Sequence, residues 1–343
     1  MSEKLQPVGQ GELSSALESA FHFRRSQGLL DSFLLKQRPT RLFHGLNDRS
    51  KDYRVGLSPF SVDCFWFEEG CCGVWVTSHE ELSSDTLTGI SSYYQGLGVS
   101  FGVVTHRQSK FALGHEPVKP IILFGDPPLG RVEVEEPGGL KFLVEFQGGR
   151  HPGLFLDHYP LRQRLLEISK SKRVLNTFSY TGSLSVAAAV GQAAQVTTVD
   201  LSKPTIEWAK QNMQINLVNN TNHEFYAADV FEFLKRAEKK KNLFDIVILD
   251  PPSFSRSKYG TFSTKKDLVK LHTLALRVLQ PGGTLISSIN TESVPRSEFE
   301  MHLQKAVAEL HRTLEIIAPI SLPGTFPEPA ARSYLKGLIA KIS

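Results

Sequence analysis

Short apolar runs and segments of helical periodicity alternate along the second part of the chain. The runs have the length and composition of buried strands, and the segments between them carry apolar residues at spacings of three and four. The pattern predicts strands at 174–176, 195–199, 244–249, 284–288, 313–317 and 334–342, and helices at 183–190, 265–279 and 298–311. This alternation is typical of a doubly wound α/β sheet, which we therefore predict here.

A further helix is predicted after Ser202, whose hydroxyl can cap it, with Pro204 in its first turn. Apolar residues that recur every three or four positions predict its buried stripe. The stripe consists of Ile206, Ala209, Met213 and Leu217, and Trp208 lies off it.

The first part of the chain has a different order of elements. The pattern predicts helices at 14–27 and 80–95 and strands at 60–67, 73–77 and 99–105, which together suggest a compact α+β unit. Loop-rich sequence follows at 108–128. We therefore expect two domains, residues 1–130 and residues 131–343.

The predicted strands of the second domain end in residues that suit a ligand. Gly182 follows the first strand and opens an Ala-rich helix, so a tight turn brings bare backbone towards a ligand. Asp200, about 20 residues past the glycine, can accept hydrogen bonds from two ribose hydroxyls. Asp229 follows a further strand that lies between 195–199 and 244–249, and it can accept from an adenine amino group. Asp250 follows the strand 244–249. Each residue alone also suits a structural turn or a helix cap, but the conjunction predicts a methyl-donor site.

The segment Asp250-Pro-Pro-Ser-Phe254 is the least expected by chance. Pro251 and Pro252 can continue neither a helix nor a sheet, so they predict a rigid loop. That loop would hold a carboxylate and an aromatic ring at the same site. Asp126-Pro-Pro128 repeats the tripeptide without a following aromatic residue, and we expect a simple turn there.

Composition narrows the class of protein. The chain has 343 residues, 41% hydrophobic and 22% charged, which suits two folded domains. The N-terminus is polar and no apolar run approaches the roughly 18 residues that span a bilayer, so we expect a cytoplasmic protein. The three cysteines, Cys64, Cys71 and Cys72, have the spacing of neither a disulfide framework nor a metal site. We expect reduced thiols and no metal.

Positive charge is concentrated in the second part of the chain. Residues 1–135 hold 13 Lys and Arg against 16 Asp and Glu, whereas residues 136–343 hold 26 against 19. Basic clusters can bind a polyanion through counterion release. The run 235–241, at the tail of a helix, is more typical of a solvated face. In the first part of the chain, the candidate residues for RNA docking are Arg24, Arg25, Arg38 and Arg41, although acidic residues outnumber basic residues there.

Four segments resemble a known family. They are Asn176-Thr-Phe-Ser-Tyr-Thr-Gly182, Val199-Asp-Leu-Ser-Lys203, Ala228-Asp-Val-Phe-Glu-Phe233 and Ile248-Leu-Asp-Pro-Pro-Ser-Phe254. Together they resemble the class I S-adenosylmethionine-dependent methyltransferases that modify large-subunit ribosomal RNA. The upstream Gly153-Leu-Phe-Leu-Asp157 is also similar, although the family pattern continues with Gln-Arg where this chain has His158-Tyr159.

The resemblance implies a Rossmann-like, doubly wound, seven-stranded sheet with S-adenosyl-L-methionine as cofactor. It also implies ribosomal RNA of the 23S type, or a pre-ribosomal particle, as the partner, and leaves a homodimer open. On the cofactor side it implies roles for Asn176, Phe178, Ser179, Tyr180, Gly182, Asp200, Leu201, Ser202, Asp229, Val230 and Asp250.

The substrate side is expected to contain catalytic and RNA-binding residues. Phe254 would stack on a base taken out of its stack, beside Asp250, Pro251 and Pro252. Arg256 and Lys258 follow this loop directly and would grip flanking phosphates, and Asn290 would lie close by.

Two chemistries compete within the family. Methylation of cytosine C5 requires a thiolate to attack C6 first, but every cysteine precedes residue 73. The strand where the cytosine enzymes of the family carry Ser-Cys-Ser has Ser287-Ser-Ile-Asn290 here. Methylation of guanine N7 needs no covalent step, because that nitrogen already presents a lone pair, and catalysis rests on positioning. The segment from Asp250 to Lys258 most resembles the guanine-N7 branch.

Two alternatives from other classes stay open. A nicotinamide-dependent oxidoreductase also uses a glycine turn and an acidic residue, but it normally has Gly-x-Gly-x-x-Gly, and this turn has only Gly182. A non-catalytic RNA-binding protein with the same fold would be expected to lose its acidic ligands, and Asp200, Asp229 and Asp250 all remain.

Overall fold

The structure is a computed structural model that describes residues 10–30, 39–44, 60–67, 70–106, 119–218, 222–291, 293–327 and 335–343. The predicted strand residue Tyr334, the candidate Arg38 and residues 108–118 of the loop-rich segment 108–128 lie outside these residues. The chain forms two compact units. The first comprises Met1–Leu156 and Pro323–Pro329, and the second Asp157–Leu322 and Ala330–Ser343.

The second unit is built on a seven-stranded sheet with the strand order β10-β9-β8-β11-β14-β16-β15. In that order the strands are Glu224–Ala227, Gln195–Asp200, Arg173–Thr177, Phe244–Leu249, Leu279–Asn290, Leu335–Ile342 and Leu314–Pro319. The first five are parallel, whereas β16 runs antiparallel to both of its neighbours. The predicted doubly wound sheet is confirmed.

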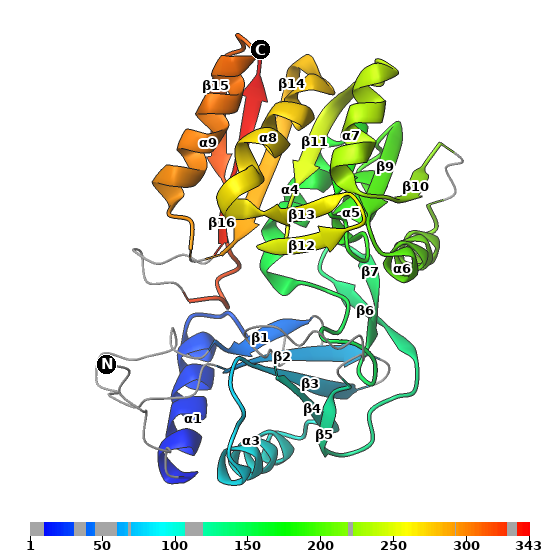
Figure 1. The fold of residues 1–343 in the computed structure, drawn as a ribbon. Helices are drawn as coiled ribbons and strands as arrows, with labels where there is room; N and C mark the ends of the chain where they lie inside the picture. Colours follow the sequence, from blue (N-terminus) through cyan, green and yellow to red (C-terminus); the bar gives the residue numbers. More distant parts are fainter. Residues whose placement is uncertain are drawn as a thin grey trace. The chain divides into compact units, whose positions relative to one another are not determined.

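Helices cover both faces of this sheet. Figure 1 shows α7 (Val230–Lys239), α8 (Thr264–Arg277) and α9 (Arg296–Glu309) in front of it, with α4 (Tyr159–Ile168) and α5 (Ser183–Val190) behind. α6 (Lys203–Ile215) packs against α5. Because both faces are covered, the central strand β11 is mostly apolar, and its residues 246–249 are all buried.

The stripe predicted for α6 is only partly correct. Ile206, Ala209 and Met213 are buried, but Leu217 is 81% exposed. The helix ends at Ile215 and Leu217 has a φ of 55°, so the periodicity no longer controls where this side chain points. Trp208, off the stripe, is only 9% exposed.

A hairpin follows the double-proline loop, where we expected only a rigid loop. β12 (Phe254–Ser257) pairs antiparallel with β13 (Gly260–Ser263). The prolines exclude residues 251 and 252 from regular structure, but their restriction ends before residue 254.

The first unit contains a five-stranded sheet with the order β1-β2-β3-β4-β5. The strands are Thr40–Phe43, Phe60–Phe67, Cys71–Ser78, Phe101–His106 and Ile121–Phe124, with helices α1 (Gln10–Ser26) and α3 (Ser84–Gly96). A hairpin of β6 (Arg131–Glu136) and β7 (Leu140–Glu145) completes the described elements. The unit is α+β, as the pattern predicts.

The compact units divide at Leu156, whereas we expected the domains to divide at residue 130. β6 contacts β2, which ties the hairpin to the first sheet. The ring of Phe146, just after β7, packs edge-on against Phe101 at 4.7 Å and against Phe65 at 5.8 Å between centroids. This aromatic cluster places residues 131–156 in the first unit.

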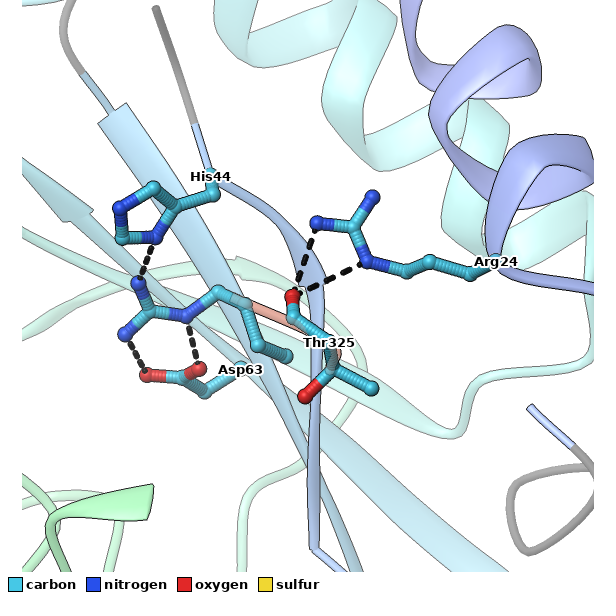
Figure 2. Close-up of polar contacts among 5 residues, drawn as sticks. Arg24, His44, Asp63 and Thr325 are labelled. Atoms are coloured by element: carbon cyan, nitrogen blue, oxygen red, sulfur yellow. Dashed lines mark hydrogen bonds and ion pairs between the residues drawn. The ribbon is translucent and has the colours of Figure 1, made fainter. Parts of the chain in front are cut away.

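Two arginines considered for RNA docking are occupied within the first unit (Figure 2). Arg24 is fully buried and donates to the carbonyl of Thr325 at 3.2 and 3.0 Å. Arg41 pairs with Asp63 and contacts His44 Nδ1 at 2.5 Å. Both guanidinium groups hold this unit together, so neither is available to a phosphate, and the expectation was wrong for these two residues.

Candidate active site

The turn between β8 and α5 is strained in a way that suits ligand binding. Phe178 and Tyr180 have φ values of 52° and 49°, and Gly182 has 78°. Positive φ costs a non-glycine residue free energy and is concentrated at functional sites. At Gly182 a side chain is also excluded by packing, because a Cβ atom would lie 2.8 Å from the Cβ of Ala209. The glycine lets α6 approach the N-terminus of α5 closely.

Asn176 lies in β8 just before this turn, and Ser179 lies within the turn. The Asn176 amide donates to Ser185 Oγ at 2.9 Å, which joins β8 to α5. Its Oδ1 atom and the hydroxyl of Ser179 are buried without a hydrogen-bond partner among the described residues. Unpartnered buried polar atoms are uncommon, and these two leave acceptor and donor capacity at a site that the sequence assigns to a ligand.

Asp200 is joined to the same turn. Its Oδ2 accepts from the backbone N–H of Tyr180 at 2.9 Å, and its Oδ1 accepts from that of Ser202 at 2.9 Å. Burial raises the pKa of Asp200 above its ordinary value, and the backbone hydrogen bonds oppose this only in part. Ser202 caps α6, and Leu201, which lies between Asp200 and Ser202, is 48% exposed. The strand end therefore presents one carboxylate and one apolar side chain.

Asp229 serves two structural contacts. As the N-cap of α7 it accepts from the backbone N–H of Glu232 at 3.2 Å through Oδ1. Its Oδ2 accepts from the hydroxyl of Ser257 on β12 at 2.7 Å. The adjacent Val230 is buried at the start of α7. The hairpin thus reaches the residue that we assigned to adenine, a contact that no local pattern predicts.

Asp250 lies between a histidine and a serine. His158 Nε2 is 3.0 Å from Oδ2, and the Ser288 hydroxyl donates to Oδ1 at 2.6 Å. Burial would raise the pKa of Asp250, but His158 and Ser288 outweigh it and hold that pKa below its usual value. His158 was not among the site residues that we predicted from the sequence. The available signal was its replacement of Gln in the family pattern.

The loop after Asp250 keeps its aromatic ring in solvent. Phe254 is 57% exposed, so it is not a core residue, and Pro251 is buried while Pro252 is exposed. The Ser253 hydroxyl donates to the carbonyl of Asn290 at 3.0 Å, which ties this loop to the end of β14.

The remaining candidates differ in location. Arg256 and Lys258 are exposed on the hairpin and its turn, and Lys258 Nζ lies 5.1 Å from the ring centroid of Tyr259. All three cysteines belong to the first unit, where Cys64 and Cys72 are buried and Cys71 is exposed. Burial raises the pKa of the Cys64 thiol well above its ordinary value.

Within the described ranges, no group of three or more His, Cys, Asp and Glu side chains is arranged to hold a metal ion. The described helices also include none that is both long and apolar enough to cross a membrane.

The sequence is similar to known methyltransferases. Ribosomal RNA large subunit methyltransferase I of Aeromonas hydrophila is 33% identical over 223 residues, which are 64% of this chain and 56% of that protein. Ribosomal RNA large subunit methyltransferase K/L of Allochromatium vinosum is 42% identical over 163 residues, which are 47% of this chain and 22% of that protein. The chain therefore spans about half the length of the first relative and about a fifth of the second.

Solved structures share the fold. A provisionally assigned SAM-dependent methyltransferase from Streptococcus mutans has a TM-score of 0.80 at 24% identity, covering 99% of this chain and 83% of that chain. A provisionally assigned methyltransferase complexed with SAH has a TM-score of 0.81 at the same identity and coverage. The sequence model of the S-adenosylmethionine-dependent methyltransferase family matches residues 111–341, which is more than half of the chain, and the protein therefore belongs to that family.

Proposed function

We propose that this protein transfers a methyl group from S-adenosyl-L-methionine to a base of large-subunit ribosomal RNA, and that the acceptor is a ring nitrogen such as guanine N7. The observation that carries the proposal is the position of Asp250. Its carboxylate is held ionised by His158 and Ser288, four positions before the exposed ring of Phe254.

The residues at the strand ends fit the donor. The strained turn at 178–182 and the unpartnered Asn176 Oδ1 and Ser179 Oγ would receive its methionine end. Asp200 would accept from the ribose hydroxyls, beside the exposed side chain of Leu201. When bound, the donor supplies an electrophilic methyl group on a sulfonium sulfur.

Asp229 can accept a hydrogen bond from the adenine only if its Oδ2 accepts from the adenine and Ser257 together, or if the hydrogen bond from Ser257 breaks. One oxygen caps α7 and the other already accepts from the Ser257 hydroxyl. A carboxylate oxygen has two acceptor positions, so an adenine amino group can be added without breaking the cap. The hairpin would then rest against the bound donor.

The RNA substrate is supported by the relatives, which are named as ribosomal RNA large subunit methyltransferases. We assign Phe254 to stack on the extruded base, because a reacting base edge must leave its stack. Arg256 and Lys258 would contact flanking phosphates and Asn290 the nucleotide beside them. The first unit would assist docking through groups other than Arg24 and Arg41. We place this reaction in the cytoplasm.

A ring nitrogen is favoured by what the second unit contains. No cysteine lies in it, and β14 carries Ser287 and Ser288 where a thiolate would be needed for attack on cytosine C6. Methylation of N7 leaves a positive charge on the base. The Asp250 carboxylate, kept ionised by its two partners, would stabilise that charge as it develops.

Nucleoside mass spectrometry of ribosomal RNA from a deletion strain tests the proposal. We expect one methylated purine to disappear, to return with the wild-type gene, and to stay absent with a gene carrying Asp200→Ala. Loss of 5-methylcytidine instead would establish the cytosine reaction, and unchanged ribosomal RNA would exclude this substrate.

A further inference from the structure

A cavity of about 590 Å³ lies beside α7 in the second unit. It is bounded by the end of β10, by α7 and by the turn between β12 and β13, and it meets the candidate donor site at Leu201 and Asp229. Its volume lies within the roughly 300–1,000 Å³ of ordinary ligand sites.

The basic residues of α7 are divided by the face on which they lie. Arg236 and Lys240, one helical turn apart, line the cavity, and within the described part of the chain neither side chain forms an ion pair or a hydrogen bond. Lys235 lies off the cavity and pairs with Glu232 at 2.7 Å. The C-terminal end of a helix attracts cations in general, but that would favour Lys239 equally, and Lys239 does not line the cavity.

Aromatic faces lie among these cations. Tyr226 is 41% exposed and Tyr259 is 53% exposed, and both line the cavity. The ring of Phe233 supports Tyr226 at 5.2 Å between centroids. Lys258 lies over Tyr259, as noted above. The site therefore combines stacking surfaces with positive charge.

The two acids that line the cavity are already engaged. Asp229 accepts from Ser257 at 2.7 Å and caps α7, and Glu232 pairs with Lys235. The hydrogen bonds to Asp229 come from neutral groups and leave its charge in place, but Arg236, Lys240 and Lys258 outnumber it, so the net charge of the lining is positive. S-adenosylmethionine carries a net positive charge at neutral pH, so it is not the ligand that these cations would attract.

We propose that this cavity binds an unpaired RNA nucleotide next to the target base. Arg236 and Lys240 contact its phosphates, and the ring of Tyr226 or Tyr259 stacks on its base. Aromatic stacking with a positively charged track is how proteins hold single strands without reading their sequence. The inference rests on the proposed function and extends its RNA-binding surface from the hairpin to α7.

The test compares two double variants of the same basic run. Arg236→Gln with Lys240→Gln removes two positive charges of the cavity, and Lys239→Gln with Lys241→Gln removes two positive charges that do not line it. Affinity for a fluorescent unpaired RNA oligonucleotide of about 12 nucleotides is measured by anisotropy over a range of salt concentrations. Calorimetry with S-adenosylhomocysteine and thermal unfolding accompany each variant.

We expect the cavity variant to bind the oligonucleotide at least about tenfold more weakly. Its salt slope should fall by about 1.4, which is about 0.7 for each lost phosphate contact. The control should change much less, and Tyr226→Leu should weaken binding roughly fivefold or more with an unchanged slope. Donor affinity and melting temperature should stay as in the wild type.

Equal losses in the two double variants would overturn the inference, because they would show a general charge effect. A cavity variant that loses only affinity for S-adenosylhomocysteine would also overturn it and make the cavity part of the donor site. If the wild type methylates ribosomal RNA and the cavity variant binds RNA as tightly as the wild type does, this inference is wrong but the proposed function stands. Wild-type protein that neither binds RNA nor methylates it would defeat the proposed function as well.

Discussion

The Nε2 atom of His158 lies 3.0 Å from Oδ2 of Asp250, although the two residues are 92 positions apart in the chain. The contact joins the segment before α4 to the end of β11. It assigns His158 a positioning role, because the imidazole fixes the carboxylate that we place beside the substrate base.

This contact predicts a pH dependence of stability. Burial would lower the pKa of His158, but Asp250 outweighs burial, and the pKa is raised above 6.5. The stabilisation by His158 is therefore fully present below pH 6.5 and is lost as the pH rises through the raised pKa. Asp250 adds stabilisation that is present above its ordinary value of 3.8 and is lost as the pH falls through its lowered pKa.

His158→Gln should remove the alkaline part of this dependence, because a glutamine amide can donate to Asp250 without titrating. The free energy of unfolding in urea, measured between about pH 6 and about pH 9, should fall for the wild type relative to the variant. If the free energies of unfolding of the wild type and the variant change in parallel with pH, the imidazole does not titrate in this range.

Asp200→Ala and Asp229→Ala should each weaken binding of S-adenosylhomocysteine. A lost hydrogen bond to a charged acceptor costs roughly 1.5–3 kcal/mol, or about tenfold to a hundredfold in affinity. Asp229→Asn is the control for the helix, since asparagine is also a good N-cap. Calorimetry that finds unchanged affinity in both alanine variants would remove these residues from the donor site.

Reversing the charge of the hairpin should affect RNA binding and leave donor binding intact. In Arg256→Glu with Lys258→Glu, the salt slope of RNA affinity should fall by about 0.7 to 0.9 for each lost phosphate contact. Filter binding at several salt concentrations measures the slope. An unaltered slope would show that both residues belong to an ordinary solvated surface and contact no phosphate.

The cysteines and Phe254 separate the two possible reactions. Cys64 and Cys72 are buried, so the suitable variant is Cys64→Ala, Cys71→Ser and Cys72→Ala, and direct transfer to a ring nitrogen predicts that it keeps its activity. Phe254→Ala should lower kcat/KM by roughly fivefold to a hundredfold, because stacking contributes about 1–3 kcal/mol. Abolished methylation in a folded cysteine variant would instead support a thiolate adduct.

Gly182→Ala should destabilise the second unit more than Gly282→Ala. Both glycines have positive φ, 78° and 74°, but an added Cβ meets Ala209 only at Gly182 and has nothing within 4 Å at Gly282. The cost of a positive φ therefore applies to both variants, and at Gly182 the close contact adds about 1–3 kcal/mol of overpacking. If the urea midpoints of the two variants fall equally, α6 moves away from the added Cβ atom without a loss of stability.

Local sequence patterns were enough to predict the sheet and the residues at its strand ends. Phe244–Leu249 and Ser183–Val190 have the predicted bounds, because a strand covered on both faces is mostly apolar and a short helix between strands must pack one face. Asp200 and Asp250 could be placed for the same local reason, since each directly follows such a strand.

Only the tertiary structure decided which of these residues meet. The approach of His158 to Asp250 and of Ser257 to Asp229 depends on how distant segments pack, and periodicity carries no information about such pairs. The same holds for α7, where five of the seven residues of the run 235–241 are basic in sequence. The fold orients Arg236 and Lys240 into a cavity and leaves Lys235 paired with Glu232, because neighbouring positions on a helix point about 100° apart.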